Sequence, residues 1–212
     1  MNFFNRLLVK ISNLIYPFKA FGVENIPNGK AVICSNHLSA IDVTFFPTIF
    51  KEDMYFLAKK ELFEKKFTAR LLSSYGAIPI DRDNLDFKAI INAIKVLKND
   101  NKLVIFPEGT RNKTGTTNLL PFKAGSMVFA TKAKCPIVPV IISNKAKVFK
   151  KTYILIGKPF ELTEFYDKKM TDEVILQMEE VVFQVMKNMQ NELPNIISQS
   201  KKKKSKNHGS NK

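Results

Sequence analysis

Short runs of β-forming residues alternate along this chain with segments that have helical spacing. Six runs are predicted to be strands: residues 31–35, 54–58, 77–80, 102–106, 137–142 and 151–157. Between them, residues 84–100 place apolar side chains three and four positions apart behind a capping Asn84 or Asp86, and residues 172–193 predict a helix that closes the domain. This alternation predicts an α/β fold, a single-domain sandwich in which helices flank a mostly buried mixed sheet.

Length, charge and cysteine content narrow the function classes. The 212 residues fit one domain, and no apolar stretch reaches the roughly 18–20 residues that span a bilayer. With 34 Lys and Arg against 19 Asp and Glu, the net charge of +15 predicts a negatively charged partner: anionic lipid, an acidic protein or nucleic acid. Cys34 and Cys135 lie within apolar runs, and the histidines are His37 and His208, so neither a disulfide framework nor a metal site is predicted.

Residues 1–18 predict a strongly amphipathic helix that stops near Pro17. Its apolar residues recur at positions 3, 4, 7, 8, 11, 14, 15 and 18. Such a stripe either packs on the protein's own core or lies in a membrane surface. Packing on the core is the commoner outcome, while the terminal position, the phenylalanines and the cations Arg6 and Lys10 support a membrane-surface helix at residues 1–18, ahead of a folded domain at 19–195.

Residues 196–212 are predicted to form a disordered polybasic tail. Residues 201–212 contain six lysines, no acid and no apolar side chain, so they cannot offset the entropy of ordering. The rest of the chain still carries a net charge of +9. The tail is either merely solvated or held near an anionic membrane, where each lysine gains about 1 kcal/mol. No recognition motif accompanies it, so nucleic acid is not an expected partner.

Polar residues follow the run 31–35 directly. His37 is the sole histidine before residue 208 and therefore the one imidazole of the predicted domain that could act as a base near neutral pH. A spacing of five would separate His37 and Asp42 by about 500° on one helix, so their pairing requires His37 to lie in the strand-to-helix turn. There Asp42 would orient the base, with Asn36 in support. The alternative is a loop histidine beside a helix-capping carboxylate.

A covalent nucleophile is not predicted beside His37. Cys34 lies three residues earlier on the strand, where alternation sends its side chain to the opposite face. Ser39 lacks the G-x-S-x-G elbow that presents a nucleophilic serine.

A second polar cluster follows the run 102–106. Gly109 allows a tight turn, in which backbone N–H groups, the Thr110 hydroxyl and the Arg111 guanidinium could hold a phosphate. An ordinary turn with a surface arginine is the alternative. Other candidate cations near this anion are Arg82, after the run 77–80, and more weakly Lys59 and Lys123, since lysines of a basic chain are usually just solvated.

Four segments resemble conserved boxes of the glycerolipid acyltransferases, in the same order, across residues 21–142. They are NHLSAID at 36–42, GAIPIDR at 76–82, FPEGTR at 106–111 and IVPVII at 137–142. Two positions depart from the family pattern: Pro79 replaces a bulkier residue, and Asn112 stands where serine is common. The similarity is greatest to the enzymes that acylate 1-acyl-glycerol-3-phosphate.

The resemblance implies an enzyme that makes phosphatidic acid from lysophosphatidic acid, with an acyl-CoA or acyl-ACP thioester as co-substrate and no bound cofactor. His37 would deprotonate the acceptor hydroxyl and Asp42 would orient it. Gly109, Thr110, Arg111 and Arg82 would bind the phosphate, while Glu108 would position this site. Pro139 would shape the acyl-chain side of the cleft. The family also implies peripheral attachment to the cytoplasmic face of the cell membrane.

Two other functions remain open from the sequence. The same residues would serve an acyltransferase whose acceptor is glycerol-3-phosphate or another lysophospholipid. In a different class, the chain would be a non-enzymatic basic protein that binds membranes or RNA. Binding alone requires no base, so the His37 and Asp42 box argues against the second alternative.

Overall fold

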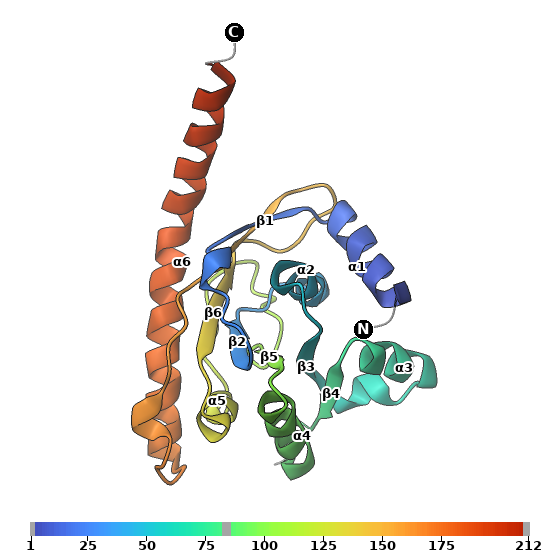
Figure 1. Cartoon of the computed structure of the whole chain (residues 1–212), viewed down its shortest axis with the longest axis vertical. Helices are drawn as coiled ribbons and strands as arrows, with labels where there is room; N and C mark the ends of the chain where they lie inside the picture. The colour runs from blue at the N-terminus through green and yellow to red at the C-terminus, as the bar shows by residue number, and fades with distance from the viewer. Residues whose placement is uncertain (1–2, 82–85, 210–212) are drawn as a thin grey trace.

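A computed structural model describes residues 3–81 and 86–209, which fold around one seven-stranded sheet (Figure 1). The sheet order is β1-β7-β6-β2-β5-β3-β4, and all neighbours are parallel except β6 and β7. This confirms the predicted α/β sandwich with a mixed sheet. The strands are β1 (Phe18–Phe21), β2 (Ala31–Ser35), β3 (Met54–Lys59), β4 (Ala77–Ile80), β5 (Lys102–Ile105), β6 (Ile137–Ile142) and β7 (Thr152–Ile156).

Helices cover both faces of the sheet, which is why every residue of β2, β5 and β6 is buried. One face packs against the short helices η2 (Ala40–Thr44) and α2 (Phe45–Phe50). The other packs against α4 (Phe87–Lys98), α5 (Val128–Ala133) and α6 (Asp172–Gly209). The remaining helices are α1 (Phe3–Ile15), η1 (Val23–Asn25), η3 (Lys60–Phe63), α3 (Lys66–Ser74) and η4 (Thr163–Phe165).

Strand direction gathers the polar segments at one edge of the sheet. Strands β2, β3, β4, β5 and β6 all run parallel, so their carboxyl ends share an edge. The segments that begin at His37 and Phe106 leave β2 and β5 at that edge, and Lys59 ends β3 there. Ligand sites of open α/β sheets lie at this edge.

Three of the six predicted strands have the bounds found in the structure, and the other three differ from them by one residue at one or both ends. Strand β1 was not predicted from the sequence. It has four half-buried residues, and it pairs only with β7, which lies far along the chain. At α4 the predicted cap is confirmed for Asp86, whose side chain accepts the N–H of Ala89. The other candidate cap, Asn84, lies outside the described residues.

Helix α6 differs from the prediction because it continues to Gly209 instead of ending at 193 (Figure 1). Residues 196–209, predicted to be disordered, are therefore helical, and residues 210–212 lie outside the described part. Ile196 and Ile197 pack against the core, and Lys19 donates to the Ser200 hydroxyl. These contacts extend the helix past Pro194, and lysine is itself a good helix former.

Helix α1 ends before Pro17, as predicted, but turns its polar side toward the domain. Asn5 is 1% exposed, and its amide donates to the carbonyl and hydroxyl oxygens of Ser74 at 2.9 and 2.7 Å. Asn13 donates to Thr48 at 2.6 Å. Most of the apolar stripe is exposed instead: Phe3, Phe4, Leu7, Ile11 and Leu14. The alternative in which this stripe packs on the core is therefore not what the structure shows.

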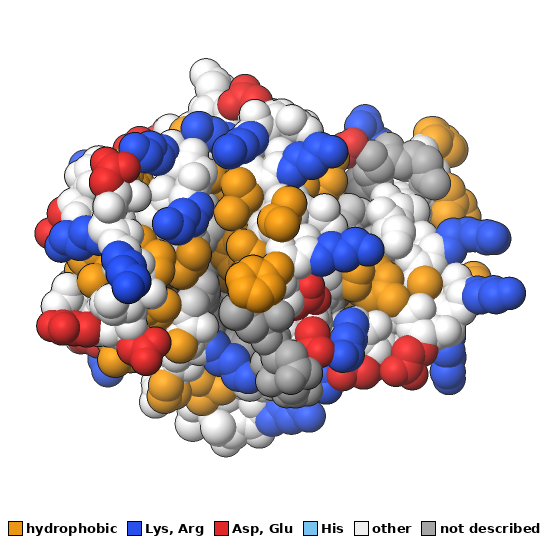
Figure 2. Space-filling view, turned by 90° about the horizontal axis from the view of Figure 1, so that it is seen from below, with side chains coloured by type: hydrophobic (Ala, Val, Ile, Leu, Met, Phe, Trp, Pro, Cys, Tyr) orange, Lys and Arg blue, Asp and Glu red, His pale blue; other side chains and the backbone are white. Residues whose placement is uncertain are grey.

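The outer surface of the α4 and α5 layer is basic. Helix α4 contains no acidic residue, and it exposes Lys88, Lys95 and Lys98 around the apolar side chains of Phe87 and Ile91. Figure 2 shows this side of the molecule, with Lys and Arg side chains around an apolar area. Among the described helices, none is both long and apolar enough to cross a membrane.

Replacing Asn5 by alanine should loosen α1 from the domain. The substitution leaves the half-buried Ser74 oxygens without these donors and should lower the free energy of unfolding by about 1–3 kcal/mol. Amide hydrogen exchange within α1 should also accelerate. Chemical denaturation and exchange measurements would test this, with the 77%-exposed Leu14→Ala as control. Equal stability of wild type and Asn5→Ala would contradict it.

Candidate active site

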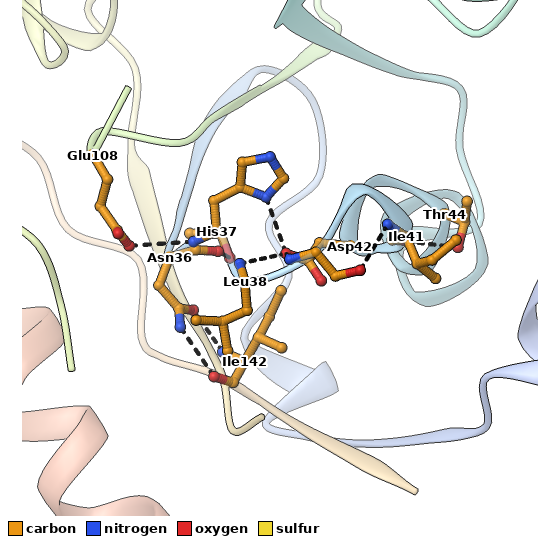
Figure 3. A network of polar contacts seen from close by, with 10 residues as sticks. Asn36, His37, Leu38, Ile41, Asp42, Thr44, Glu108 and Ile142 are labelled. Atoms are coloured by element: carbon orange, nitrogen blue, oxygen red, sulfur yellow. Dashed lines mark hydrogen bonds and ion pairs between the residues drawn. The ribbon is translucent and has the colours of Figure 1, made fainter. Parts of the chain in front are cut away.

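His37 and Asp42 form a directly bonded pair in the turn between β2 and η2 (Figure 3). The ring nitrogen Nδ1 of His37 lies 3.0 Å from Oδ2 of Asp42. The Asp42 side chain is fully buried, whereas that of His37 keeps 16% of its surface exposed. Because a carboxylate oxygen accepts, the neutral imidazole that donates to it carries its proton on Nδ1, and its Nε2 can accept one. The strand-to-helix position predicted for His37 is confirmed.

The same carboxylate organises the local backbone. Oδ2 of Asp42 also accepts the N–H groups of Leu38 and Ser39, both at 2.7 Å. Ser39 has the extended conformation of a helix N-cap and forms a capping box with Asp42. Asp42 therefore both caps η2 and orients His37, so the two alternatives raised by the sequence hold together. The Ser39 hydroxyl accepts the N–H of Ile41 at 3.3 Å, in keeping with a capping function.

Phe106 packs against the face of the His37 ring and so helps to fix the plane of that ring. The two rings are stacked, with centroids 4.0 Å apart and planes 19° apart. Phe106 directly follows β5, so its place at the carboxyl edge is set by the same strand direction. The sequence analysis placed Phe106 at the end of the run 102–106 and gave it no such function.

Buried polar groups connect the loops at this edge. The N–H of Asn112 donates to the His37 carbonyl at 2.7 Å, and the His37 N–H donates to Oε1 of Glu108 at 3.2 Å. Asn36 joins β2 to β6, since its amide donates to the Ile142 carbonyl at 3.0 Å and accepts the Ile142 N–H at 2.7 Å. Figure 3 shows Glu108 and Asp42 on opposite sides of His37. The polar segments that follow β2 and β5 thus form one site.

Glu108 is 3% exposed, and burial raises its pKa to about 7. The His37 N–H opposes this rise, while the negative charge of Asp42 adds to it. Glu108 therefore titrates in the neutral range and contacts the backbone of the candidate base. Its positioning function stays a prediction.

The loop of Gly109, Thr110 and Arg111 continues from Glu108 toward solvent. Gly109 has a φ of +64°, and a Cβ at this position would lie 2.6 Å from Cδ of Lys123. The aliphatic part of the Lys123 side chain thus crosses the loop. The backbone N–H of Lys123 donates to the Pro107 carbonyl at 2.8 Å. Thr110 and Arg111 are exposed. Lys123, a weak candidate from the sequence, lies beside this loop.

Asn112, a departure from the family pattern, organises the segment that follows. Its side chain donates to the Asn118 carbonyl at 2.7 Å and accepts the N–H and hydroxyl of Thr114 at 2.9 and 2.7 Å. Pro79, the other departure, is exposed on β4 at the edge of the sheet, where a missing N–H is tolerated. Neither residue replaces a group of the His37 and Asp42 pair.

Two predicted site residues form their described contacts with groups other than His37. Lys59 pairs with Glu61 at 3.2 Å. Pro139 is buried within β6, where its carbonyl accepts the Gly157 N–H at 2.9 Å. Arg82 lies outside the described residues.

Cys34 is buried on the opposite face of the sheet, as predicted. Its thiol lies 3.4 Å from the Met186 sulfur, and burial raises its pKa well above the usual range. Within residues 3–81 and 86–209 there is also no cluster of three His, Cys, Asp or Glu side chains that could hold a metal ion.

An apolar groove of about 340 Å³ lies between the end of β6 and α6. Ile142, whose backbone is bonded to Asn36, forms part of its wall. Pro139 does not line it. The lining residues are Thr117, Ile141, Ile142, Ser143, Gln190, Leu193, Pro194 and Ile197.

Comparisons with known proteins identify relatives of this chain. Residues 18–143 match the family model described as "Acyltransferase". The chain is 32% identical over 185 residues to a 1-acyl-sn-glycerol-3-phosphate acyltransferase of Bacillus subtilis, covering 84% of this chain and 90% of the relative. A relative of the same name from Helicobacter pylori is 36% identical over 131 residues, which are 60% of this chain and 54% of the relative.

A solved structure extends the likeness to three dimensions. The crystal structure of the 1-acyl-sn-glycerophosphate (LPA) acyltransferase PlsC from Thermotoga maritima superposes with a TM-score of 0.66 at 25% identity. The match covers 89% of this chain and 79% of that one. The family model covers more than half of the chain, and the chain therefore belongs to the acyltransferase family.

Glu108→Gln should change how stability depends on pH. The folded protein holds the Glu108 proton up to about pH 7, against an ordinary value of 4.5. Between these values the folded state binds more protons than the unfolded state, so wild-type stability should fall as pH rises, by at most about 3 kcal/mol. Urea denaturation from acid to mildly alkaline pH would measure this. The fall should be absent in Glu108→Gln and present in the exposed control Glu64→Gln.

Proposed function

We propose that the chain transfers a fatty acyl group from an acyl thioester to the free hydroxyl of lysophosphatidic acid, giving phosphatidic acid. The observation that carries the proposal is the His37 and Asp42 pair, which directs Nδ1–H to a buried carboxylate and leaves Nε2 as an acceptor. The names of the relatives support this acceptor and product.

In the proposed reaction, Nε2 of His37 takes the proton from the acceptor hydroxyl as its oxygen attacks the thioester carbonyl. The new C–O bond forms, the C–S bond breaks, and the thiolate leaves with the proton from the imidazolium. Asp42 holds the ring orientation and stabilises the positive charge that forms on it. Phe106 keeps the ring in the same plane throughout. Covalent catalysis by Cys34 is not proposed, because this thiol is on the other face of the sheet.

The phosphate of the acceptor is proposed to bind at the loop of Gly109, Thr110 and Arg111. This loop is exposed, it lies next to the base through the Glu108 and Asn112 contacts with His37, and Lys123 crosses it. Arg82 is proposed as a further cation from the end of β4. A guanidinium can bind two phosphate oxygens at once. The neighbouring groove, with Ile141, Leu193 and Ile197 in its wall, is suited to an acyl chain.

The enzyme is proposed to work peripherally at the cytoplasmic face of the membrane, where its lipid acceptor lies. Helix α1 supports this, because its polar side binds the domain and its apolar stripe is exposed. The basic body and α6 suit an anionic surface. Acyl-CoA and acyl carrier protein are both suitable donors for a basic protein, because each carries negative charge.

His37→Ala should lower phosphatidic acid formation by roughly 100- to 10,000-fold, because it removes the general base. The measurement uses lysophosphatidic acid in detergent micelles, with palmitoyl-CoA and palmitoyl-carrier-protein as parallel donors, and circular dichroism to show that the variant folds. Glycerol-3-phosphate and a second lysophospholipid would identify a different acceptor. Equal activity of the folded variant would contradict the assignment of His37. A wild type inactive with every acceptor would contradict the proposed function.

Arg111→Ala should reduce kcat/KM for lysophosphatidic acid by roughly 10- to 100-fold, since a charge-assisted contact to the phosphate is lost. With monoacylglycerol, which lacks the phosphate, wild type and variant should differ little. Lys113→Ala, which removes an exposed cation two residues away, serves as the matched control. A loss of the same size with both acceptors would contradict phosphate binding by Arg111.

A further inference from the structure

The loop between β6 and β7, residues 143–151, presents an apolar tip within a basic segment. Val148 and Phe149 are 51% and 77% exposed at its tip. They are the central residues of a turn closed by the Lys150 N–H, which donates to the Lys147 carbonyl at 3.0 Å. The segment contains no acid, and its exposed lysines are Lys145, Lys147, Lys150 and Lys151.

The conformation of Phe149 is not one that its side chain favours. Its φ of +54° lies in the left-handed region, where turns usually place Gly or Asn. An exposed phenylalanine there gains little from core packing. Turn formation therefore does not explain why a phenylalanine stands at this position. A contact of its side chain with a partner outside the folded domain would explain it.

The loop is held firmly beside the end of α1. Ala146 is buried in the core, the Phe149 N–H donates to the Ile15 carbonyl at 2.8 Å, and the Thr152 N–H donates to the Pro17 carbonyl at 2.9 Å. Figure 1 shows the loop reaching the end of α1. Leu14, next to Ile15, is 77% exposed. The apolar tip of the loop thus adjoins the exposed apolar stripe of α1.

We propose that the β6–β7 loop is a second membrane-binding element, which inserts Val148 and Phe149 into an anionic bilayer while its lysines contact the lipid phosphates. An apolar tip surrounded by cations matches the acyl boundary and the negative headgroups of such a surface. The inference rests on the proposed attachment of α1 to the membrane and adds a second point of contact.

Two contacts would orient the catalytic domain on the bilayer. Helix α1 is bonded through Ser12 and Asn13 to Thr44 and Thr48, which lie in η2 and α2. Helix η2 also contains Asp42. With the loop inserted as well, rotation about the axis of α1 is prevented. The His37 site would then keep a constant height and tilt above its lipid substrate.

The test compares two double variants of the full chain. Val148→Ser with Phe149→Asn removes the apolar tip, and asparagine tolerates the left-handed backbone, so thermal stability should be equal or higher. Phe87→Asn with Ile91→Ser removes a similar exposed pair from the α4 layer. Flotation with vesicles of phosphatidylglycerol and phosphatidylcholine measures binding, and activity in detergent micelles is measured in parallel.

Binding to the mixed vesicles should weaken about tenfold for the loop variant and remain unchanged for the α4 variant. Each single replacement of one of the four lysines by glutamine should weaken binding to the mixed vesicles by about fivefold at low salt. Binding to vesicles of pure phosphatidylcholine should be unchanged. The inference would be overturned if the loop variant bound the mixed vesicles as tightly as the wild type does. It would also be overturned if both double variants lost the same amount of vesicle binding. In the first case the loop would be free for an acidic protein partner.

Micellar activity separates this inference from the proposed function. The loop variant should retain it, because Val148 and Phe149 contact neither His37 nor the phosphate loop. A wild type that binds vesicles through the loop but makes no phosphatidic acid in micelles would refute the proposed function alone. A loop variant that loses micellar activity while its vesicle binding is unchanged would refute the loop assignment.

Discussion

The carboxylate of Asp42 is the constraint on which the site depends. One oxygen accepts from the His37 ring and from two backbone N–H groups. It therefore fixes the turn after β2, begins η2 and holds the imidazole, all from a fully buried position. A buried carboxylate with three donors is costly to displace, so the orientation of the ring is fixed by the fold itself.

The wider site depends on how loops from different strands are joined. Asn36 connects the ends of β2 and β6 with two hydrogen bonds to Ile142, as a further pair of strand residues would. Asn112 and Glu108 connect the loop after β5 to His37. These contacts join the candidate base and the candidate phosphate loop, although the segments are far apart in sequence. The parallel strands, buried on both faces, supply the fixed frame.

The architecture was predictable because local patterns encode it. Continuous apolar runs such as 137–142 indicate buried strands, and the spacing of His37 from Asp42 required a turn between strand and helix. What the sequence did not show depends on contacts across the chain: β1 needs β7 as its partner, and Phe106 stacks on His37 only because β2 and β5 are neighbours. The helical end of α6 was missed for the same reason. Composition alone favours disorder there, whereas Ile196 and Ile197 gain burial against the core.

The state of the two cysteines gives the chain a practical property. Cys34 and Cys135 have no exposed surface, and burial raises the pKa of both thiols, that of Cys135 to about 11. At neutral pH both are protonated and shielded, so they react slowly with maleimides and similar reagents. A single cysteine introduced on the surface would then be the one readily labelled thiol of the chain. Fluorophores or spin labels could thus report insertion depth residue by residue, with the native cysteines left in place.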